Sequence, residues 1–337
     1  MKLARILSLI CLLGTTLVVG QSDKNTFRVP LGLTPMLWPK DNPYTPEKAE
    51  LGRLLYYDKR VSSDNTVACA SCHAAEKGFT DSLPVSVGIR GQKGGMSAPT
   101  VINRGYGQLQ FWDGRAGSLE AQAIGPMANS IEMGHSHEGV VKQLRKIPGY
   151  RSQFKTVFGT EEFDLEMVAK AIATFERTVV SGNSPYDKFR SGDKKALTAA
   201  QVRGFNVFVN KAKCDACHEG SNFTLNAFHN LGVGSQKAVP DEGRFAVTKD
   251  PADWGTFKTP TLREIAKTAP YMHDGSLATL EEVVEYYDKG GVKNKNLDER
   301  LKPLQLTAAE KKDLVEFMKS LNGEGWQHLT EPKSFPQ

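Results

Sequence analysis

Two short stretches of the sequence share one pattern: Cys69-Ala70-Ser71-Cys72-His73 and Cys214-Asp215-Ala216-Cys217-His218. Both have the form C-x-x-C-H, and together they use every cysteine of the chain except Cys11. This form is typical of c-type haem attachment, because each thiol adds to a vinyl group of the porphyrin and the adjacent histidine ligates the iron. The sequence therefore predicts two covalent haem c groups. Their attachment residues are Cys69, Cys72 and His73 for the first haem and Cys214, Cys217 and His218 for the second.

Two other uses of paired cysteines fit this pattern less well. A zinc site needs its ligand pairs close together, whereas these pairs lie far apart in the chain. A dithiol oxidoreductase needs the two cysteines but has no need of the histidine that follows them. Haem attachment is the interpretation that uses all the residues of both copies.

The start of the chain predicts an export signal. Lys2 and Arg5 are followed by an apolar stretch over residues 6–13 and by small residues up to Gly20. This order of charged, apolar and small segments is typical of a signal peptide, here residues 1–20, that is cleaved on export to the periplasm. An uncleaved anchor is the alternative.

Composition and charge limit the remaining classes of function. The 337 residues, 39% of them hydrophobic, are enough for two globular domains. The formal net charge is only +5, two of it from the predicted signal, and no long Lys/Arg run is present. Nucleic acid is therefore not an expected partner.

Amphipathic helices predict the fold class. Five helix starts are marked by capping residues followed by apolar residues at helical spacing. These starts are Thr45, Asp164, Thr198, Thr279 and Thr307. Alternating strand patterns are scarce, so we expect a mainly α fold with two cytochrome c-like domains and one haem in each. A Gly-, Ser- and Pro-containing segment over 181–195 predicts a linker, which divides the mature chain into domains over 21–190 and 191–337.

Several further runs carry a family resemblance. They are SAPTVIN (97–103), FWDGR (111–115), SLEAQ (118–122), GPM (125–127), IEMG (131–134), TPTLR (259–263) and APYMHDG (269–275). These runs resemble the bacterial dihaem cytochrome c peroxidase family, which includes the MauG-like enzymes. The resemblance covers essentially the whole mature chain.

The resemblance implies a peroxide-reducing site at the His73 haem. Glu132 matches the catalytic carboxylate of the family, which moves a proton during peroxide cleavage. Gln122 and Pro126 match residues that line the same pocket, and Trp112 matches a tryptophan that relays electrons between the haems. The alternatives are a solvated loop acid at Glu132, a surface glutamine at Gln122 and a core aromatic at Trp112.

The sixth coordination position of the first haem is predicted to be open. Between His73 and His135 the sequence has no histidine, and its methionines are Met96, Met127 and Met133. Many family members carry a displaceable histidine in the loop matched here by residues 87–90, and this chain does not. We therefore expect an iron that binds peroxide without prior reductive activation.

The second haem departs from the commonest family pattern. Helical spacing after Thr279 places Tyr287, and not Tyr286, on the inward face. By resemblance, this position holds the methionine ligand of ordinary dihaem peroxidases and the tyrosine ligand of MauG-like enzymes. Tyr287 is therefore the predicted distal ligand, with Met272 or Met318 as the alternative.

Two other inferences depend on the resemblance. The family holds a calcium ion between its domains, and Thr268 and Pro270 match two of its ligand positions, while Ser97 stands where an asparagine is common. MauG-like enzymes that oxidise a partner protein use a tryptophan two residues before the second haem motif, and here that residue is Ala212. This substitution favours simple peroxide reduction.

The predicted function is a periplasmic peroxidase that reduces hydrogen peroxide to water. Its electrons would come from a small cytochrome c or cupredoxin. Dimers are common in the family, so a homodimer is compatible with this function. One alternative is a MauG-like oxidase that uses a peroxide-derived, high-valent haem to oxidise a protein or organic substrate. A dihaem electron carrier with no substrate chemistry is the third hypothesis, and the pair Gln122 and Glu132 disfavours it. His229 and His273 are expected to make structural hydrogen bonds.

Overall fold

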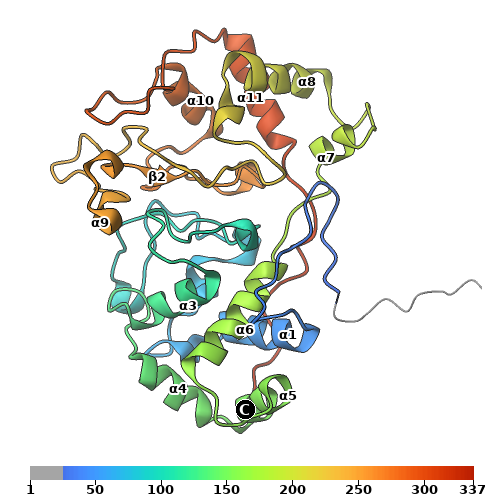
Figure 1. The fold of residues 1–337 in the computed structure, drawn as a ribbon, viewed down its shortest axis with the longest axis vertical. Coiled ribbons are helices and arrows are strands. Elements are labelled where there is room, and N and C mark those ends of the chain that lie inside the picture. Colours follow the sequence, from blue (N-terminus) through green and yellow to red (C-terminus); the bar gives the residue numbers. More distant parts are fainter. Residues whose placement is uncertain (1–25) are drawn as a thin grey trace, which may run out of the picture.

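The computed structural model describes residues 26–337, so the predicted signal peptide and Cys11 lie outside the described residues. Helices dominate this part of the chain (Figure 1). The helices are α1 (Pro46–Tyr57), α2 (Cys69–Cys72), α3 (Leu119–Ala128), α4 (His137–Arg145), α5 (Pro148–Phe158), α6 (Leu165–Thr178), α7 (Pro185–Arg190), α8 (Ala199–Asn206), α9 (Phe245–Thr248), α10 (Leu280–Asp288) and α11 (Ala308–Lys319). Strands β1 (Phe228–His229) and β2 (Phe257–Lys258) form one antiparallel pair in which His229 lies opposite Phe257.

Short turns of 3₁₀ helix connect many of these elements. They span Lys59–Val61, Ala75–Lys77, Ile89–Gly91, Arg104–Tyr106, Cys214–Ala216, Pro251–Asp253 and Ile265–Lys267. None of the helices within 26–337 has the length and apolar character that a membrane crossing requires.

The fold contains two units of similar design, each with its own hydrophobic core. In the first unit α1 packs across α6, and in the second α8 packs across α11. The two crossings are closely alike, because each brings a glycine, Gly52 or Gly204, against the backbone of the partner helix. Figure 1 shows the two units one above the other, with the β pair on the side of the second unit that faces the first. The arrangement confirms the predicted mainly α class.

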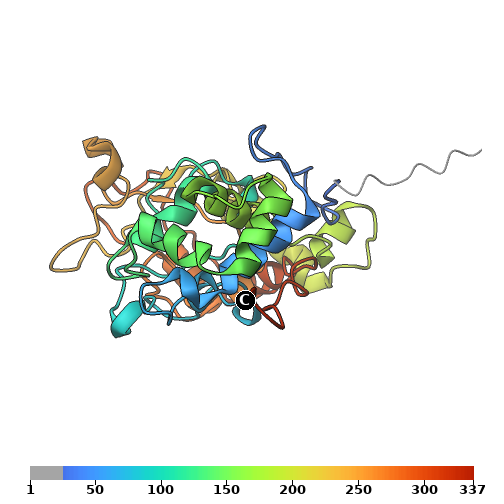
Figure 2. The same ribbon diagram turned by 90° about the horizontal axis from the view of Figure 1, so that it is seen from below.

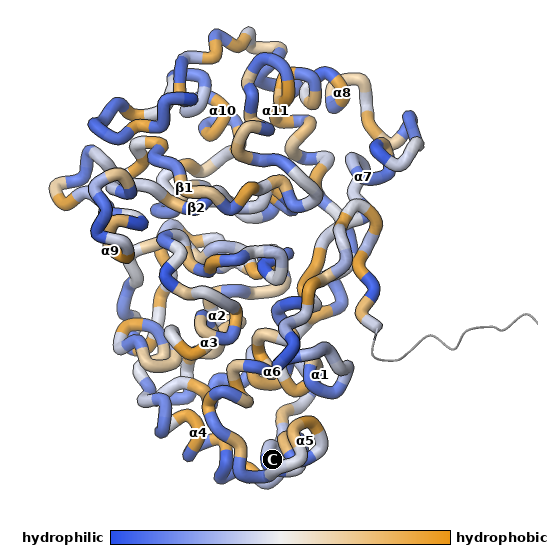
Figure 3. The backbone as a smooth tube through the Cα atoms, in the orientation of Figure 1, coloured by the Kyte–Doolittle hydropathy of each residue, from blue (hydrophilic) through white to orange (hydrophobic). Residues whose placement is uncertain are grey.

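Capping explains where the main helices begin. The side chains of Thr45, Asp164, Thr198, Thr279 and Thr307 each accept a hydrogen bond from a backbone N–H in the first turn of α1, α6, α8, α10 and α11. These contacts satisfy donors that have no partner inside the helix. Hydrophobic and hydrophilic residues alternate along α6 (Figure 3), as expected for a helix with one buried face.

One helix prediction is confirmed and one needs correction. The amphipathic spacing after Thr198 predicts a helix with Val209 on its inner face, and Val209 packs partly buried against the core of the second unit. The helix α8 itself ends at Asn206 and continues as a π-helical turn over Val207–Lys211, which also buries Val207 and Phe208. The sequence after Thr307 predicts a helix that stops at Gly323, but α11 ends at Lys319, because the Ser320 N–H and hydroxyl both bond to the Phe317 carbonyl.

The C-terminal tail returns to the first unit. Trp326 is buried in the core of that unit and lies against Phe79, with their ring centroids 6.1 Å apart. Farther along, the Tyr57 hydroxyl donates to the Leu329 carbonyl at 2.7 Å. The C terminus consequently lies near α1 and α5 (Figures 1 and 2).

Residues 181–189 of the predicted linker are well packed, whereas residues 190–195 are exposed. The linker contains α7, whose first turn is closed by a capping box between Ser184 and Asp187. Asp187 also forms a buried, two-pronged ion pair with Arg263, at 2.6 and 2.9 Å. The Arg263 guanidinium donates in addition to the Ser221 carbonyl, so α7 is tied directly to the loop that follows the second C-x-x-C-H motif.

Candidate haem and peroxide sites

The two C-x-x-C-H motifs have the same geometry around their histidines. Nδ1 of His73 lies 3.3 Å from the Phe79 carbonyl oxygen, and Nδ1 of His218 lies 3.0 Å from that of Phe223. A bond from Nδ1–H to a carbonyl fixes the tautomer and leaves Nε2 free to ligate a metal. Burial lowers the pKa of both histidines, that of His218 to about 4, so both rings are neutral, as ligation requires.

The second motif opens into a cavity of about 500 Å³. Its lining includes both thiols of the motif, His218, Phe208 and Tyr287. None of the four cysteines of the two motifs forms a disulfide, so all four are available for vinyl addition. The thiols, a neutral histidine and a mainly apolar cavity beside them fit a covalent haem.

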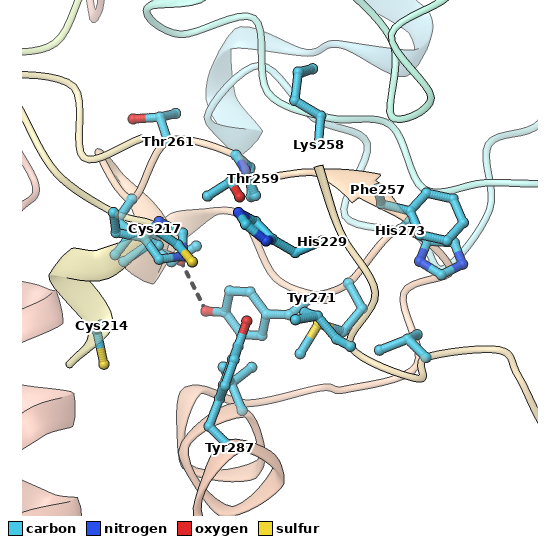
Figure 4. A pocket seen from close by; sticks show the side chains of 18 of the residues that line it. Cys214, Cys217, His229, Phe257, Lys258, Thr259, Thr261, Tyr271, His273 and Tyr287 are labelled. Carbon is cyan, nitrogen blue, oxygen red and sulfur yellow. Dashed lines mark hydrogen bonds between the residues drawn. The ribbon is translucent and has the colours of Figure 1, made fainter. Parts of the chain in front are cut away.

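Tyr287 lies inside this cavity and Tyr286 does not. The Tyr287 side chain points from α10 into the cavity, toward the side where Cys217 and His229 lie (Figure 4). Its hydroxyl has no hydrogen-bond partner within residues 26–337, whereas the Tyr286 hydroxyl donates to the Leu231 carbonyl at 2.7 Å. Burial raises the pKa of Tyr287, with a further contribution from the two nearby thiols. Met272 and Met318, the alternative ligands, also line the cavity.

Glu132 follows α3 in a tight turn that folds back onto the helix. Met133 N–H donates to the Pro126 carbonyl at 3.3 Å, and the Asn129 side chain donates to the Glu132 carboxylate at 2.7 Å. The turn is also joined to the 87–92 loop, because Ile89 N–H donates to the Glu132 carbonyl at 2.9 Å. Gly88 packs so closely there that an added Cβ would lie 2.8 Å from the Glu132 Cα.

The Glu132 carboxyl lies on the side of the first haem motif. Burial raises its pKa, against opposing effects of Arg115 and Asn129. Burial is also the main cause that raises the pKa of the Cys69 and Cys72 thiols, and the Glu132 charge adds to both shifts. The structure therefore brings a half-buried acid near the attachment point of the first haem.

Gln122 and Pro126 lie four residues apart on α3, so they share one face of that helix. Gln122 is half-buried, and its side chain makes no hydrogen bond to the described part of the chain. Because the Glu132 turn folds onto Pro126, all three residues belong to one region of the first unit.

Trp112 lies at the junction of the two units. Its indole Nε1–H donates to the Ser97 carbonyl at 2.9 Å, and its own carbonyl accepts from the Lys258 N–H at 2.8 Å. Trp112 also lines the cavity that contains the second motif. A residue of the first unit thus reaches the haem cavity of the second.

The three residues matched to calcium ligands lie around the same junction. Ser97, Thr268 and Pro270 all line the cavity, and the Ser97 N–H donates to the His273 carbonyl at 2.8 Å. Backbone carbonyls and hydroxyls of this kind are ligands that Ca²⁺ accepts.

Part of the cavity lining could not be predicted from the sequence. His229 makes the expected structural bond, from Nδ1 to Asp298 at 2.6 Å, but its Nε2 is buried without a partner in the described chain. Lys258 and Arg104 also line the cavity, although they are far apart in sequence. His273 makes its expected bond as well, from Nε2 to Asp241 at 2.8 Å.

The fold and these sites define a c-type cytochrome with two haem c groups. The family model for di-haem cytochrome c peroxidase matches residues 46–195. The chain is 43% identical over 289 residues to the methylamine utilization protein MauG of Methylorubrum extorquens, covering 85% of this chain and 81% of the relative. It is 39% identical over 288 residues to the cytochrome c551 peroxidase of Nitrosomonas europaea, covering 84% and 82%.

A solved structure agrees with these relatives. It belongs to a MauG-like protein associated with microbial copper homeostasis, has a TM-score of 0.84 and 35% identity, and covers 91% of this chain and 99% of that one. The protein therefore belongs to the di-haem cytochrome c peroxidase family. This membership confirms the predicted fold of two cytochrome c-like units, the two haem c groups and the enzyme class, an oxidoreductase of the peroxidase type.

Proposed function

We propose that the protein is a periplasmic peroxidase that reduces hydrogen peroxide to water at the His73 haem. Electrons enter through the His218 haem from a small cytochrome c or a cupredoxin. The main support is the position of Glu132, a half-buried acid held near Cys69 and Cys72 by bonds to Asn129 in its own turn and to Ile89 in the 87–92 loop.

The chain's own residues supply the proton chemistry. When bound, the haem at His73 supplies an iron at which peroxide is bound and reduced. The Glu132 carboxylate accepts the proton of the incoming peroxide and returns it to the departing hydroxide, which leaves as water. Burial raises the pKa of Glu132 toward the operating range, which suits a group that must both take and give a proton.

Two further roles complete the proposal. Gln122 and Pro126 shape the pocket beside Glu132, and Trp112 forms the route for electrons between the units. Trp112 suits this role because it contacts residues of both units and lines the haem cavity. Tyr287 is the proposed distal ligand of the second haem, because its hydroxyl faces the cavity without another partner among residues 26–337.

The decisive test is Glu132→Gln. This variant keeps the size of the side chain and removes its ability to carry the proton, so we expect both haems to remain attached and turnover to fall by about 100-fold or more. The assay is peroxide-dependent oxidation of a reduced cytochrome c or cupredoxin. Glu138→Gln, which changes an exposed acid in the first turn of α4, is the matched control. Turnover of Glu132→Gln close to that of the control would exclude Glu132 as the proton carrier.

A MauG-like oxidase is the second candidate function. Tyr287 favours it, because an anionic ligand stabilises oxidised iron and so supports the storage of oxidising equivalents. Ala212, buried in the cavity wall where those enzymes use tryptophan, opposes it. Peroxide added to the diferric protein separates the candidates. A spectral change that persists without a donor supports the oxidase, prompt turnover with a donor supports the peroxidase, and no change supports an electron carrier.

The organisation of the mature protein is part of the same proposal. Residues 1–20 form the cleaved signal, 21–190 the peroxidatic domain and 191–337 the electron-transfer domain. The separate cores of the two units support this division, and the tail from Trp326 onward then belongs to the second domain in sequence while packing on the first. We also propose a calcium ion at Ser97, Thr268 and Pro270 and a homodimeric assembly.

A further inference from the structure

Two buried basic side chains face the junction between the units. Lys258 is 5% exposed and Arg104 is 8% exposed, and both line the cavity next to Trp112. They come from different units, Lys258 from β2 and Arg104 from the 3₁₀ turn Arg104–Tyr106. A buried cation is normally paired with an acid, because removing a charge from water is costly.

Lys258 has no such pair. Within residues 26–337 its amine makes no hydrogen bond and no ion pair. Figure 4 shows its side chain leaving β2 away from His229 and Tyr271, toward segments of the first unit. Asp113 is near enough to raise the pKa of Lys258, but it is engaged by Arg115 at 2.9 Å. Burial and the neighbouring Arg104 outweigh Asp113 and lower the pKa of Lys258 well below its ordinary value.

Arg104 is also without an acid partner. Its guanidinium donates to the Gln110 side-chain oxygen at 2.8 and 3.0 Å and to the Leu109 carbonyl at 2.9 Å, which are both neutral acceptors. The charge of Glu176 acts to raise the pKa of Arg104, but no hydrogen bond joins the two side chains. Burial raises the pKa of Glu176 to about 8, so at neutral pH this carboxyl is largely protonated and leaves the arginine charge uncompensated.

The missing partner is an anion of carboxylate type. Ammonium and guanidinium groups both bind carboxylates through short, charge-assisted hydrogen bonds. The cavity that Lys258 and Arg104 line also holds Cys214, Cys217 and His218, so a haem attached there lies within the same space. Each haem c carries two propionates, which are the carboxylates that the cofactor brings to this cavity.

We infer that Lys258 and Arg104 bind a haem propionate at the junction between the two units. The inference depends on the two haems of the family and not on peroxidase turnover. A propionate paired with these cations places less net negative charge near its iron. Such pairing favours the ferrous form, so Lys258 and Arg104 raise the reduction potential of the haem that they hold.

The test is a spectroelectrochemical titration of Lys258→Met, a neutral side chain of similar length. We expect the ferric-to-ferrous equilibrium of one haem to shift about tenfold toward the ferric form, which is about 59 mV for one electron. The other haem should shift much less, and the haem that moves identifies whose propionate is bound. Resonance Raman spectra should show a matching change in the propionate bending mode of that haem.

Matched variants make the result specific. Lys258→Arg keeps the charge and should restore the potential, and Lys293→Met, which removes an exposed lysine of the same unit, should leave both potentials unchanged. If Lys258→Met does not fold with both haems, Arg104→Gln is titrated in its place and the same shift is expected. Potentials and propionate modes equal to those of Lys293→Met would overturn the inference, even in a protein with full peroxidase activity. If Glu132→Gln loses turnover while Lys258→Met still shifts the potential of one haem, the result supports the propionate inference independently of the proposed mechanism.

Discussion

Replacing Gly52 by alanine tests whether the two units are separate cooperative structures. A Cβ on Gly52 would lie 2.6 Å from the Ala171 carbonyl carbon and 2.9 Å from the Phe175 Cβ, both on α6. The Ala171 carbonyl oxygen lies nearer still, and ordinary van der Waals contact begins at 3.4 Å, so α1 and α6 must separate by more than the 0.8 Å shortfall at the carbonyl carbon. Such overpacking costs about 1–3 kcal/mol.

A smaller effect acts in the opposite direction. Alanine is the better helix former by about 0.5–1 kcal/mol. Because the clash is with backbone, the upper part of the overpacking range applies, about 2–3 kcal/mol. The net loss in the free energy of unfolding is then about 1–2.5 kcal/mol, which lowers the Tm of a unit of this size by about 2–10 °C. Gly204→Ala should have an equal effect on α8 and α11, since its Cβ would lie 2.6 Å from the Asp313 carbonyl carbon and 2.8 Å from the Phe317 Cβ.

Hydrogen exchange measured by mass spectrometry on the holoprotein localises each effect. We expect Gly52→Ala to lower protection of the α1 and α6 peptides and Gly204→Ala to lower protection of the α8 and α11 peptides. Gly117→Ala is the control, because its Cβ would meet nothing within 4 Å. Equal loss of protection in both units from either substitution would show that they unfold together. An unchanged Tm would show that the helix crossings have room for a Cβ.

Two other predictions concern ligation and pH. If Tyr287 is the distal ligand, the ferric absorption spectrum lacks a methionine-to-iron charge-transfer band, and the Tyr287→Met variant gains one. Such a band in the unsubstituted protein would assign the ligand to Met272 or Met318 instead. The second concerns Glu176, whose pKa burial raises from 4.5 to about 8. The unfolded chain therefore loses this proton first as the pH rises, so the native protein should lose stability between about pH 5 and pH 8. Glu176→Gln should flatten this fall in Tm, and parallel curves for the two proteins would contradict the assignment.

Features that depend on a few consecutive residues could be predicted from the sequence. A capping threonine bonds to a backbone N–H three residues later, so Thr45 and Thr307 mark the starts of α1 and α11 without knowledge of the fold. The same holds for Tyr287, because helical spacing from Thr279 decides which of two adjacent tyrosines faces inward. The haem motifs are equally local.

Features that depend on the path of the chain could not be predicted. Trp326 packs on Phe79 only because the tail leaves the second unit and returns to the first. The sequence around either residue does not indicate this contact. Lys258 and Arg104 meet at one cavity for the same reason. The π-helical turn Val207–Lys211 was missed because its residues also fit an α-helical pattern.

The two units share one scaffold, and the difference in function that we propose depends on a few segments. Their C-x-x-C-H motifs match, since His73 and His218 each bond to a phenylalanine carbonyl in the loop that follows. The residues that we propose for the distal sides come from unrelated elements, the turn after α3 with Glu132 in the first unit and α10 with Tyr287 in the second. A proton-carrying acid suits an iron that binds peroxide, whereas a ligand such as a tyrosine hydroxyl closes the sixth position. On this proposal the shared scaffold fixes how each haem is attached, and the distal segment decides whether its iron meets substrate or only exchanges electrons.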